Sequence, residues 1–190
     1  MKIGLEIKGK ICYTVSVFLY ILFIFDIFGG AAVKTAIVYY SKTGAAAECA
    51  RELYKLIPDA KLFNLAVDSC DVSSFDNVIL GGGIRAGMIP KQLKKFVSEN
   101  ELTIQKKNVG IFVCCADYRQ NLSYIEQNFP AIIVKKAVAA DGFGARMNPD
   151  EMKGFDKFVA KIAMKKIIKA GGSAPSIDKS KISLFAKKFI

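Results

Sequence analysis

The residues best suited to do chemistry are four consecutive ones, Ser41–Gly44, which follow a short apolar run and precede an alanine-rich stretch. The run has the character of a buried strand, and the stretch that begins at Ala45 favours a helix. A strand that feeds a hydroxyl-rich turn and then a helix presents backbone N–H groups, two hydroxyls and the positive end of the helix dipole to one point. The pattern predicts a phosphate site built from backbone. The alternative is an ordinary strand–turn–helix junction with a hydroxyl cap.

A second glycine-rich stretch, Gly81–Gly87, follows the apolar run Asn77–Leu80. Its Gly81-x-Gly83-x-x-Ala86 spacing formally matches a dinucleotide fingerprint. However, it follows the third predicted strand instead of the first, and no acidic residue ends the next strand about 20 residues on. The lysine-bearing G-x-x-x-x-G-K-[ST] loop is absent as well. We therefore exclude both kinds of nucleotide site.

The hydropathy pattern supplies an alternating series of elements to position these loops. Apolar runs predict strands at 35–40, 61–65, 77–80, 108–115 and 131–140. Helical spacing predicts helices at 45–56, 90–100, 121–128, 149–169 and 179–189. Such alternation predicts an α/β fold, a parallel sheet with helices on both faces.

The first loop resembles the S/T-x-T-G-x-T pattern of the flavodoxin family, which wraps the 5′-phosphate of FMN. Ser41, Thr43 and Gly44 match that pattern, and Ala46 stands where it has its last threonine. The resemblance implies a flavodoxin-like three-layer sandwich with a five-stranded parallel sheet in the order 2-1-3-4-5. It also implies that FMN lies at the carboxyl ends of strands one and three.

The second loop resembles a flavodoxin-domain branch that includes menaquinone-dependent protoporphyrinogen oxidase, with the pattern G-x-S-I-R-Y-G-H. The serine and tyrosine positions are Gly83 and Ala86 here, and the histidine is Met88. A third stretch, 155–164, resembles the pattern W/F-x-D-x-F/M-x-x-K-x-x-M of that branch through Asp156, Phe158, Lys161 and Met164. The long loop that the oxidases carry after strand four is absent, because only residues 116–121 lie there.

The resemblance implies cofactor-binding residues in three loops, and Tyr118 is the best remaining candidate to pack on the flavin ring. They are Ser41, Lys42, Thr43, Gly44, Ala45 and Ala46 in the first loop, Gly82, Gly83, Ile84, Arg85, Ala86 and Gly87 in the second, and Cys115, Ala116, Asp117 and Tyr118 in the third. No catalytic acid or base and no metal ligand is expected, because the chain has no histidine and no C-x-x-C pair.

Composition points to a reducing compartment and to anionic partners. The five cysteines are odd in number and lie in apolar contexts, so we interpret them as buried packing residues of a cytoplasmic protein. Residues 33–190 hold 25 basic and 15 acidic residues, a net charge of +10. That charge favours an acidic redox protein or an anionic membrane surface where a quinone is reached, with the lysines of helix 149–169 as the contact. A solvated lysine-rich surface is the alternative, and no nucleic-acid motif is present.

The first 32 residues form a separate segment before the domain of residues 33–190. Residues 11–28 are almost wholly apolar and follow three lysines. They fit a membrane anchor, which would make the protein membrane-associated, or a signal peptide. A third interpretation, which we favour, is that Val33 is the natural start and residues 1–32 are upstream sequence.

We therefore expect an FMN-binding protein of flavodoxin fold that transfers electrons through the flavin to a redox partner protein or a quinone. One alternative is an enzyme like the protoporphyrinogen oxidases. The other is a flavodoxin-fold binding module that has lost its cofactor, which Ala46 and the three glycines at 81–83 make conceivable.

Overall fold

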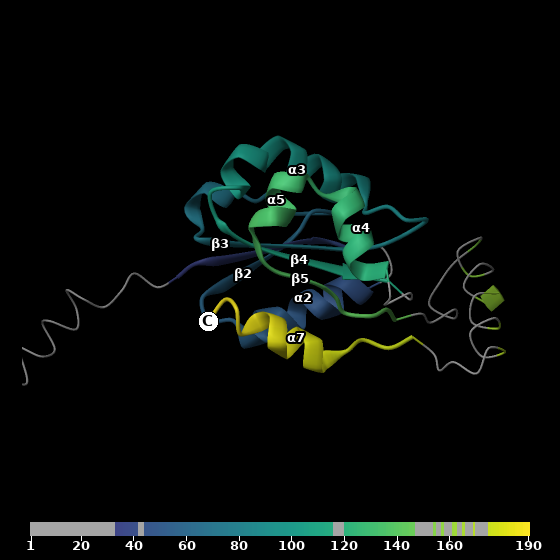
Figure 1. Ribbon diagram of the computed structural model, residues 1–190. Coiled ribbons are helices and arrows are strands. Elements are labelled where there is room, and N and C mark those ends of the chain that lie inside the picture. Colours follow the sequence, from purple (N-terminus) through teal and green to yellow (C-terminus); the bar gives the residue numbers. More distant parts are fainter. Residues whose placement is uncertain are drawn as a thin grey trace, which may run out of the picture. The chain divides into compact units, whose positions relative to one another are not determined.

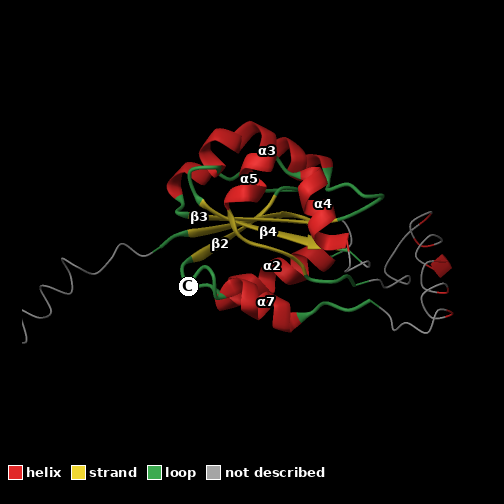
Figure 2. Ribbon diagram, viewed as in Figure 1, coloured by secondary structure: helices red, strands yellow, loops and turns green. Residues whose placement is uncertain are grey.

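The computed structural model describes residues 33–41, 44–115, 120–146 and 175–190, with six single helical positions between 147 and 174. Five strands alternate with helices along the chain (Figures 1 and 2). The strands are β1 (Thr35–Tyr40), β2 (Ala60–Asn64), β3 (Asn77–Gly83), β4 (Asn108–Cys114) and β5 (Ala137–Gly142). The helices are α2 (Ala45–Leu56), α3 (Lys91–Ile104), α4 (Asn121–Asn128), α5 (Ala131–Lys136) and α7 (Lys179–Ala186), with a short 3-10 turn, η1, at Val72–Ser74.

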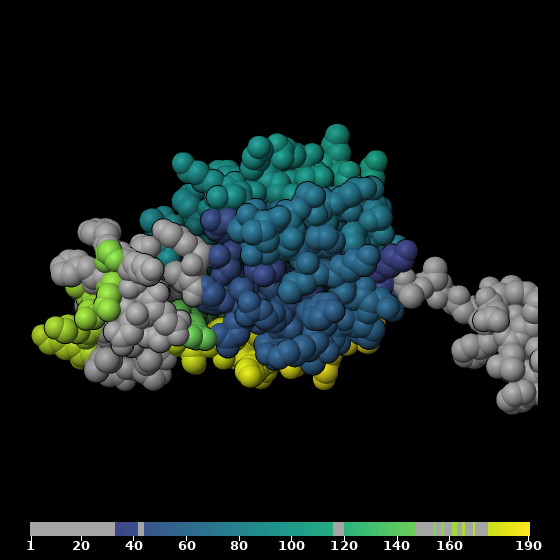
Figure 3. Space-filling view, turned by 180° about the vertical axis from the view of Figure 1, so that it is seen from behind, coloured from purple at the N-terminus to yellow at the C-terminus, as the bar shows by residue number. Residues whose placement is uncertain are grey.

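The five strands form one parallel sheet in the order β2-β1-β3-β4-β5, so the predicted fold and strand order are confirmed. Helices α3, α4 and α5 cover one face of this sheet, and α2 and α7 cover the other (Figure 1). From behind, residues of the β1–β3 region lie between the teal helical layer and the yellow C-terminal segment (Figure 3). The domain therefore has three layers, as expected for its class.

Alternation along the central strands divides the core into two halves. In β4, Val109, Ile111 and Val113 face the layer of α3, α4 and α5, while Phe112 and Cys114 face α2 and α7. The three central strands are almost wholly buried, whereas the edge strands β2 and β5 are only partly covered. A strand that is buried on both faces has a continuous run of apolar residues, which is why the hydropathy pattern predicted these strands.

Several boundaries differ from the sequence predictions. Helix α3, predicted to end at 100, continues to Ile104, and α7, predicted to end at 189, ends at Ala186. The predicted fifth strand, 131–140, is wrong over its first half, because Ala131–Lys136 is helix α5 and only Ala137–Gly142 is strand. Pro130 precedes this helix, and its carbonyl oxygen accepts from the N–H groups of Ile133 and Val134. The fixed backbone geometry of proline suits the start of a helix, and here it outweighs the strand preference of the β-branched residues that follow. The third strand also continues beyond Leu80 to Gly83.

Candidate functional site

The candidate site lies at the carboxyl ends of β1 and β3, where the sheet changes its winding direction. After β1 the chain enters α2 on one face, and after β3 it enters α3 on the opposite face (Figure 1). Tyr40 pairs with Gly82 at the end of this strand pair, so the two loops that follow begin side by side. In doubly wound folds, ligands bind where the helices leave toward opposite faces of the sheet, so these two loops are the expected ligand site.

The first loop ends in a helix whose amino end is open to an anion. Gly44 precedes α2 with φ at 89°, and as a glycine it has no side chain that could cap this helix end. The N–H of Gly44 donates to Ser41 Oγ at 3.1 Å, and a Cβ at Gly44 would meet nothing within 4 Å. The first N–H groups of a helix have no intrahelical acceptor, so this end can accept a phosphate.

The sequence-predicted residues Ala45 and Ala46 contribute backbone only. Their side chains are buried in the core between α2 and the sheet. At Ala46 a threonine would therefore have to place its hydroxyl against that core. Glu48, also in the first turn, would repel a phosphate, but Arg146 beyond β5 lies 3.3 Å from its carboxylate and offsets the charge.

The second loop is a tight turn that follows β3. Ile84 donates its N–H to the carbonyl of Cys114 on β4 at 2.9 Å, which continues the sheet for one residue. The backbones of Arg85 and Met88 then bond each other reciprocally at 2.9 and 3.0 Å. Ala86 and Gly87, between them, have φ values of 48° and 79°. Both central residues thus have positive φ, as in a type I′ turn, although Ala86 is not glycine.

The three glycines at the end of β3 have different surroundings. A Cβ at Gly81 would lie 1.9 Å from the Phe112 ring, and one at Gly82 would lie 2.9 Å from Leu93. At Gly83 a Cβ would meet only a carbonyl oxygen, at 3.9 Å. Gly81 and Gly82 therefore serve close packing, whereas the Cβ position of Gly83 has no close neighbour.

Asn128 holds the second loop in place, and sequence reasoning missed it. Its Oδ1 accepts from the N–H of Ile89 at 3.0 Å, and its Nδ2 donates to the carbonyl oxygens of Gly87 and Tyr124, both at 2.8 Å. The side chain is buried, at 6% exposed. An asparagine that ends a predicted helix is the only local signal, and it does not reveal a partner some 40 residues away in the chain.

A second asparagine, Asn121, holds the start of the third loop. The thiol of Cys115 donates to Asn121 Oδ1 at 2.8 Å, and Asn121 Nδ2 donates to the carbonyl of Gly142 at 3.4 Å. Cys115 is buried and directed at Asn121, so its side chain is a packing group here. Five predicted site residues lie outside the described residues: Lys42, Thr43, Ala116, Asp117 and Tyr118.

Among the described residues, the two loops combine a helix start whose Gly44 has no capping side chain, a hydrogen-bonded turn with exposed Arg85, and space at the Cβ position of Gly83. The start of α2 offers N–H donors to an anion. No cluster of three or more metal-binding side chains occurs within the described ranges. Of the described helices, none is long and apolar enough to cross a bilayer. The apolar segment 11–28 lies outside those ranges, as does most of the lysine-bearing helix predicted at 149–169.

Known families and structures agree with this fold. The family model described as Flavodoxin domain matches residues 36–175. Oxidised Flavodoxin 2 from Bacillus cereus is 17% identical with a TM-score of 0.52, and the match covers 82% of this chain and 97% of that one. A flavoprotein in complex with FMN from Lactobacillus acidophilus is 15% identical with a TM-score of 0.46, covering 58% of this chain and 93% of that one. No curated protein matches the chain.

Proposed function

The chain belongs to the flavodoxin domain family, and from this membership and the geometry of the two loops we propose that it binds FMN and transfers electrons through the flavin. The observation that carries the proposal is the start of α2, where Gly44 has no capping side chain and the first helical N–H groups can meet an anion. This helix end suits a single phosphate, and the loop after β3, where the Cβ position of Gly83 has no close neighbour, suits a flat ring. FMN has both parts, and a flavoprotein with a similar fold was solved in complex with FMN.

Each part of the site has a task in this proposal. The flavin supplies the redox chemistry when it is bound. The amides at the start of α2 hold the phosphate, together with the hydroxyls of Ser41 and Thr43. The turn at 85–88, fixed by Asn128, borders the ring, and the exposed Arg85 on it favours negative charge that reduction adds. Ala116, Asp117 and Tyr118 are the proposed contacts from the third loop.

The test is the cofactor of the purified protein. We expect a flavin absorbance spectrum and FMN, one per chain, as the molecule released on heating. Thr43→Ala should weaken FMN binding roughly 10- to 150-fold, the equivalent of about 1.5–3 kcal/mol for a hydrogen bond to a charged group. Ser183→Ala on the exposed face of α7 is the matched control and should leave the FMN dissociation constant unchanged. Release of FAD or NAD without FMN would refute the proposal.

A second candidate is an oxidase-like enzyme that passes electrons from protoporphyrinogen to menaquinone. The similarity of residues 75–97 to that branch favours it, as does the lack of large side chains at Gly83 and Ala86, which leaves room for a second flat molecule. Porphyrin fluorescence that appears on incubation with protoporphyrinogen and menaquinone would support this enzyme. A chain that binds no flavin at any concentration would instead favour the cofactor-free binding module.

We also propose an anionic partner, either an acidic redox protein or an anionic membrane surface. The support is the net charge of +10 over residues 33–190 and the exposure of Lys161 and Lys165. Binding to anionic vesicles or to such a protein should fade as salt shortens the Debye length from about 10 Å at 0.1 M to about 3 Å at 1 M. Replacing Lys157, Lys161 and Lys165 by glutamate should abolish the attraction and leave flavin binding intact.

A further inference from the structure

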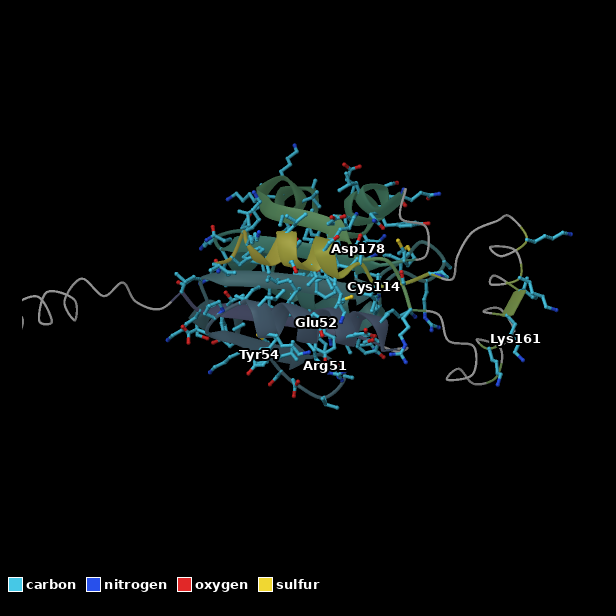
Figure 4. All side chains as sticks on the ribbon, turned by 90° about the horizontal axis from the view of Figure 1, so that it is seen from below. Arg51, Glu52, Tyr54, Cys114, Lys161 and Asp178 are labelled. Carbon is cyan, nitrogen blue, oxygen red and sulfur yellow. The ribbon has the colours of Figure 1, made fainter. Side chains whose placement is uncertain are left out.

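Two thiols that the proposed function does not use lie in contact at the edge of the candidate site. Cys49 is in the second turn of α2. Cys114, which Figure 4 labels, is the last residue of β4. Their sulfur atoms are 3.5 Å apart. Cys49 is fully buried and Cys114 is 4% exposed. The two residues are 65 positions apart in the chain, so only the packing of α2 on the sheet brings them together.

The contact connects two elements that carry loops of the candidate site. Helix α2 begins where the first loop ends, and β4 ends where the third loop starts. The other two described cysteines differ in their surroundings. Cys115 bonds Asn121, and Cys70 is only half-buried.

In the structure both cysteines are reduced. The hydrogen bond to Cys49 and the burial of its sulfur raise the pKa of the Cys114 thiol well above its usual value. Thiolate is the reactive form of cysteine, so oxidation should be slow at neutral pH and faster as pH rises. Because the two sulfur atoms lie so close together, a sulfur that has been oxidised reacts with the neighbouring thiol before it reacts with a reagent from solution.

We propose that Cys49 and Cys114 form a reversible disulfide under hydrogen peroxide, which ties α2 covalently to β4. One thiol attacks a peroxide oxygen and gives a sulfenic acid and one water. The second thiol then attacks that sulfur, the S–S bond forms, and a second water leaves. In total the two thiols lose two protons and two electrons, and one peroxide is reduced to two waters.

The experiment treats the full chain with hydrogen peroxide and follows it by intact mass and peptide mapping. We expect the mass to fall by two hydrogen atoms and a peptide pair to appear that joins Cys49 to Cys114. The thermal unfolding midpoint should rise by roughly 5–15 °C, because the bond closes a long loop in the unfolded chain. Dithiothreitol should reverse both changes. None of these readouts depends on FMN, so failure here is distinct from failure of the proposed function.

Single variants identify the pair. Cys49→Ala and Cys114→Ala should each abolish the crosslink and the rise in midpoint, whereas Cys115→Ala, the matched buried thiol, should retain both. The proposal is refuted if peroxide adds oxygen to the native chain without joining these cysteines. It is also refuted if the pair stays reduced while the half-buried Cys70 oxidises.

Discussion

Replacing Asn128 by alanine tests whether the second loop depends on a single buried side chain. The amide group of Asn128 bonds Ile89 N–H, the Gly87 carbonyl and the Tyr124 carbonyl, at 2.8 to 3.0 Å. Alanine removes all three bonds without changing the backbone of α4. The Tyr124 carbonyl lies within that helix, where the main chain can still satisfy it. The groups at Ile89 and Gly87 lose their partner.

The expected cost follows from burial. Ile89 is buried and Gly87 is partly exposed, so water can reach the second orphaned group more easily than the first. A buried polar group left without a partner costs about 1–3 kcal/mol. We therefore expect Asn128→Ala to lower the free energy of unfolding by about 2–4 kcal/mol, a large part of the 5–15 kcal/mol typical of a domain. Because the loop borders the proposed ring site, FMN affinity should fall as well.

The assay is urea unfolding followed by circular dichroism, with Gln127→Ala as the matched control. Gln127 is the preceding residue, is exposed, and donates to Ser123 on its own helix. We expect this control to change the free energy of unfolding by less than about 0.5 kcal/mol. If Asn128→Ala costs no more than the control, the loop does not depend on this side chain and the reasoning is wrong.

An isosteric variant gives a second test through pH. In Asn128→Asp the acceptor for Ile89 remains, but a carboxylate faces the two carbonyl oxygens that the amide had bonded. Burial and these oxygens should raise the folded pKa of this aspartate above its unfolded value of about 3.9. The native state then binds the proton more tightly, so stability is retained at low pH and is lost as pH rises through the folded pKa. A variant whose stability rises with pH in that range would contradict this account.

Three further predictions concern single positions. Gly81→Ala should lower the free energy of unfolding by about 1–3 kcal/mol, because its Cβ would lie 1.9 Å from the buried Phe112 ring. Gly83→Ala, whose Cβ would have nothing closer than 3.9 Å, should melt within a degree or two of the parent protein. Ala86→Gly should stabilise the fold by about 0.5–1 kcal/mol in urea unfolding, since alanine is strained at a φ of 48°. Burial raises the pKa of the Cys70 thiol to about 11, so its rate of alkylation by iodoacetamide should keep rising with pH up to that value, and a plateau near pH 9 would speak against it.

The sequence by itself determined the class of the fold and the location of the first two loops. Buried parallel strands and amphipathic helices leave local patterns, so the predicted bounds of α2 and α4 agree with the structure. The loop pattern at Ser41–Gly44 adds the family, and through the family the strand order. Both kinds of signal are contained in short stretches of chain, where spacing and residue type suffice.

Only the tertiary structure decided which residues hold the site together. Asn128 meets Ile89 across 39 positions, and Cys49 meets Cys114 across 65. Ala46, which replaces a threonine of the family pattern, proves to be a core residue of α2. Pairings of this kind depend on how helices dock on the sheet, and docking is set by the packing of the whole core. No local stretch of sequence contains that information, which is why the loops could be located from the sequence but their supports could not.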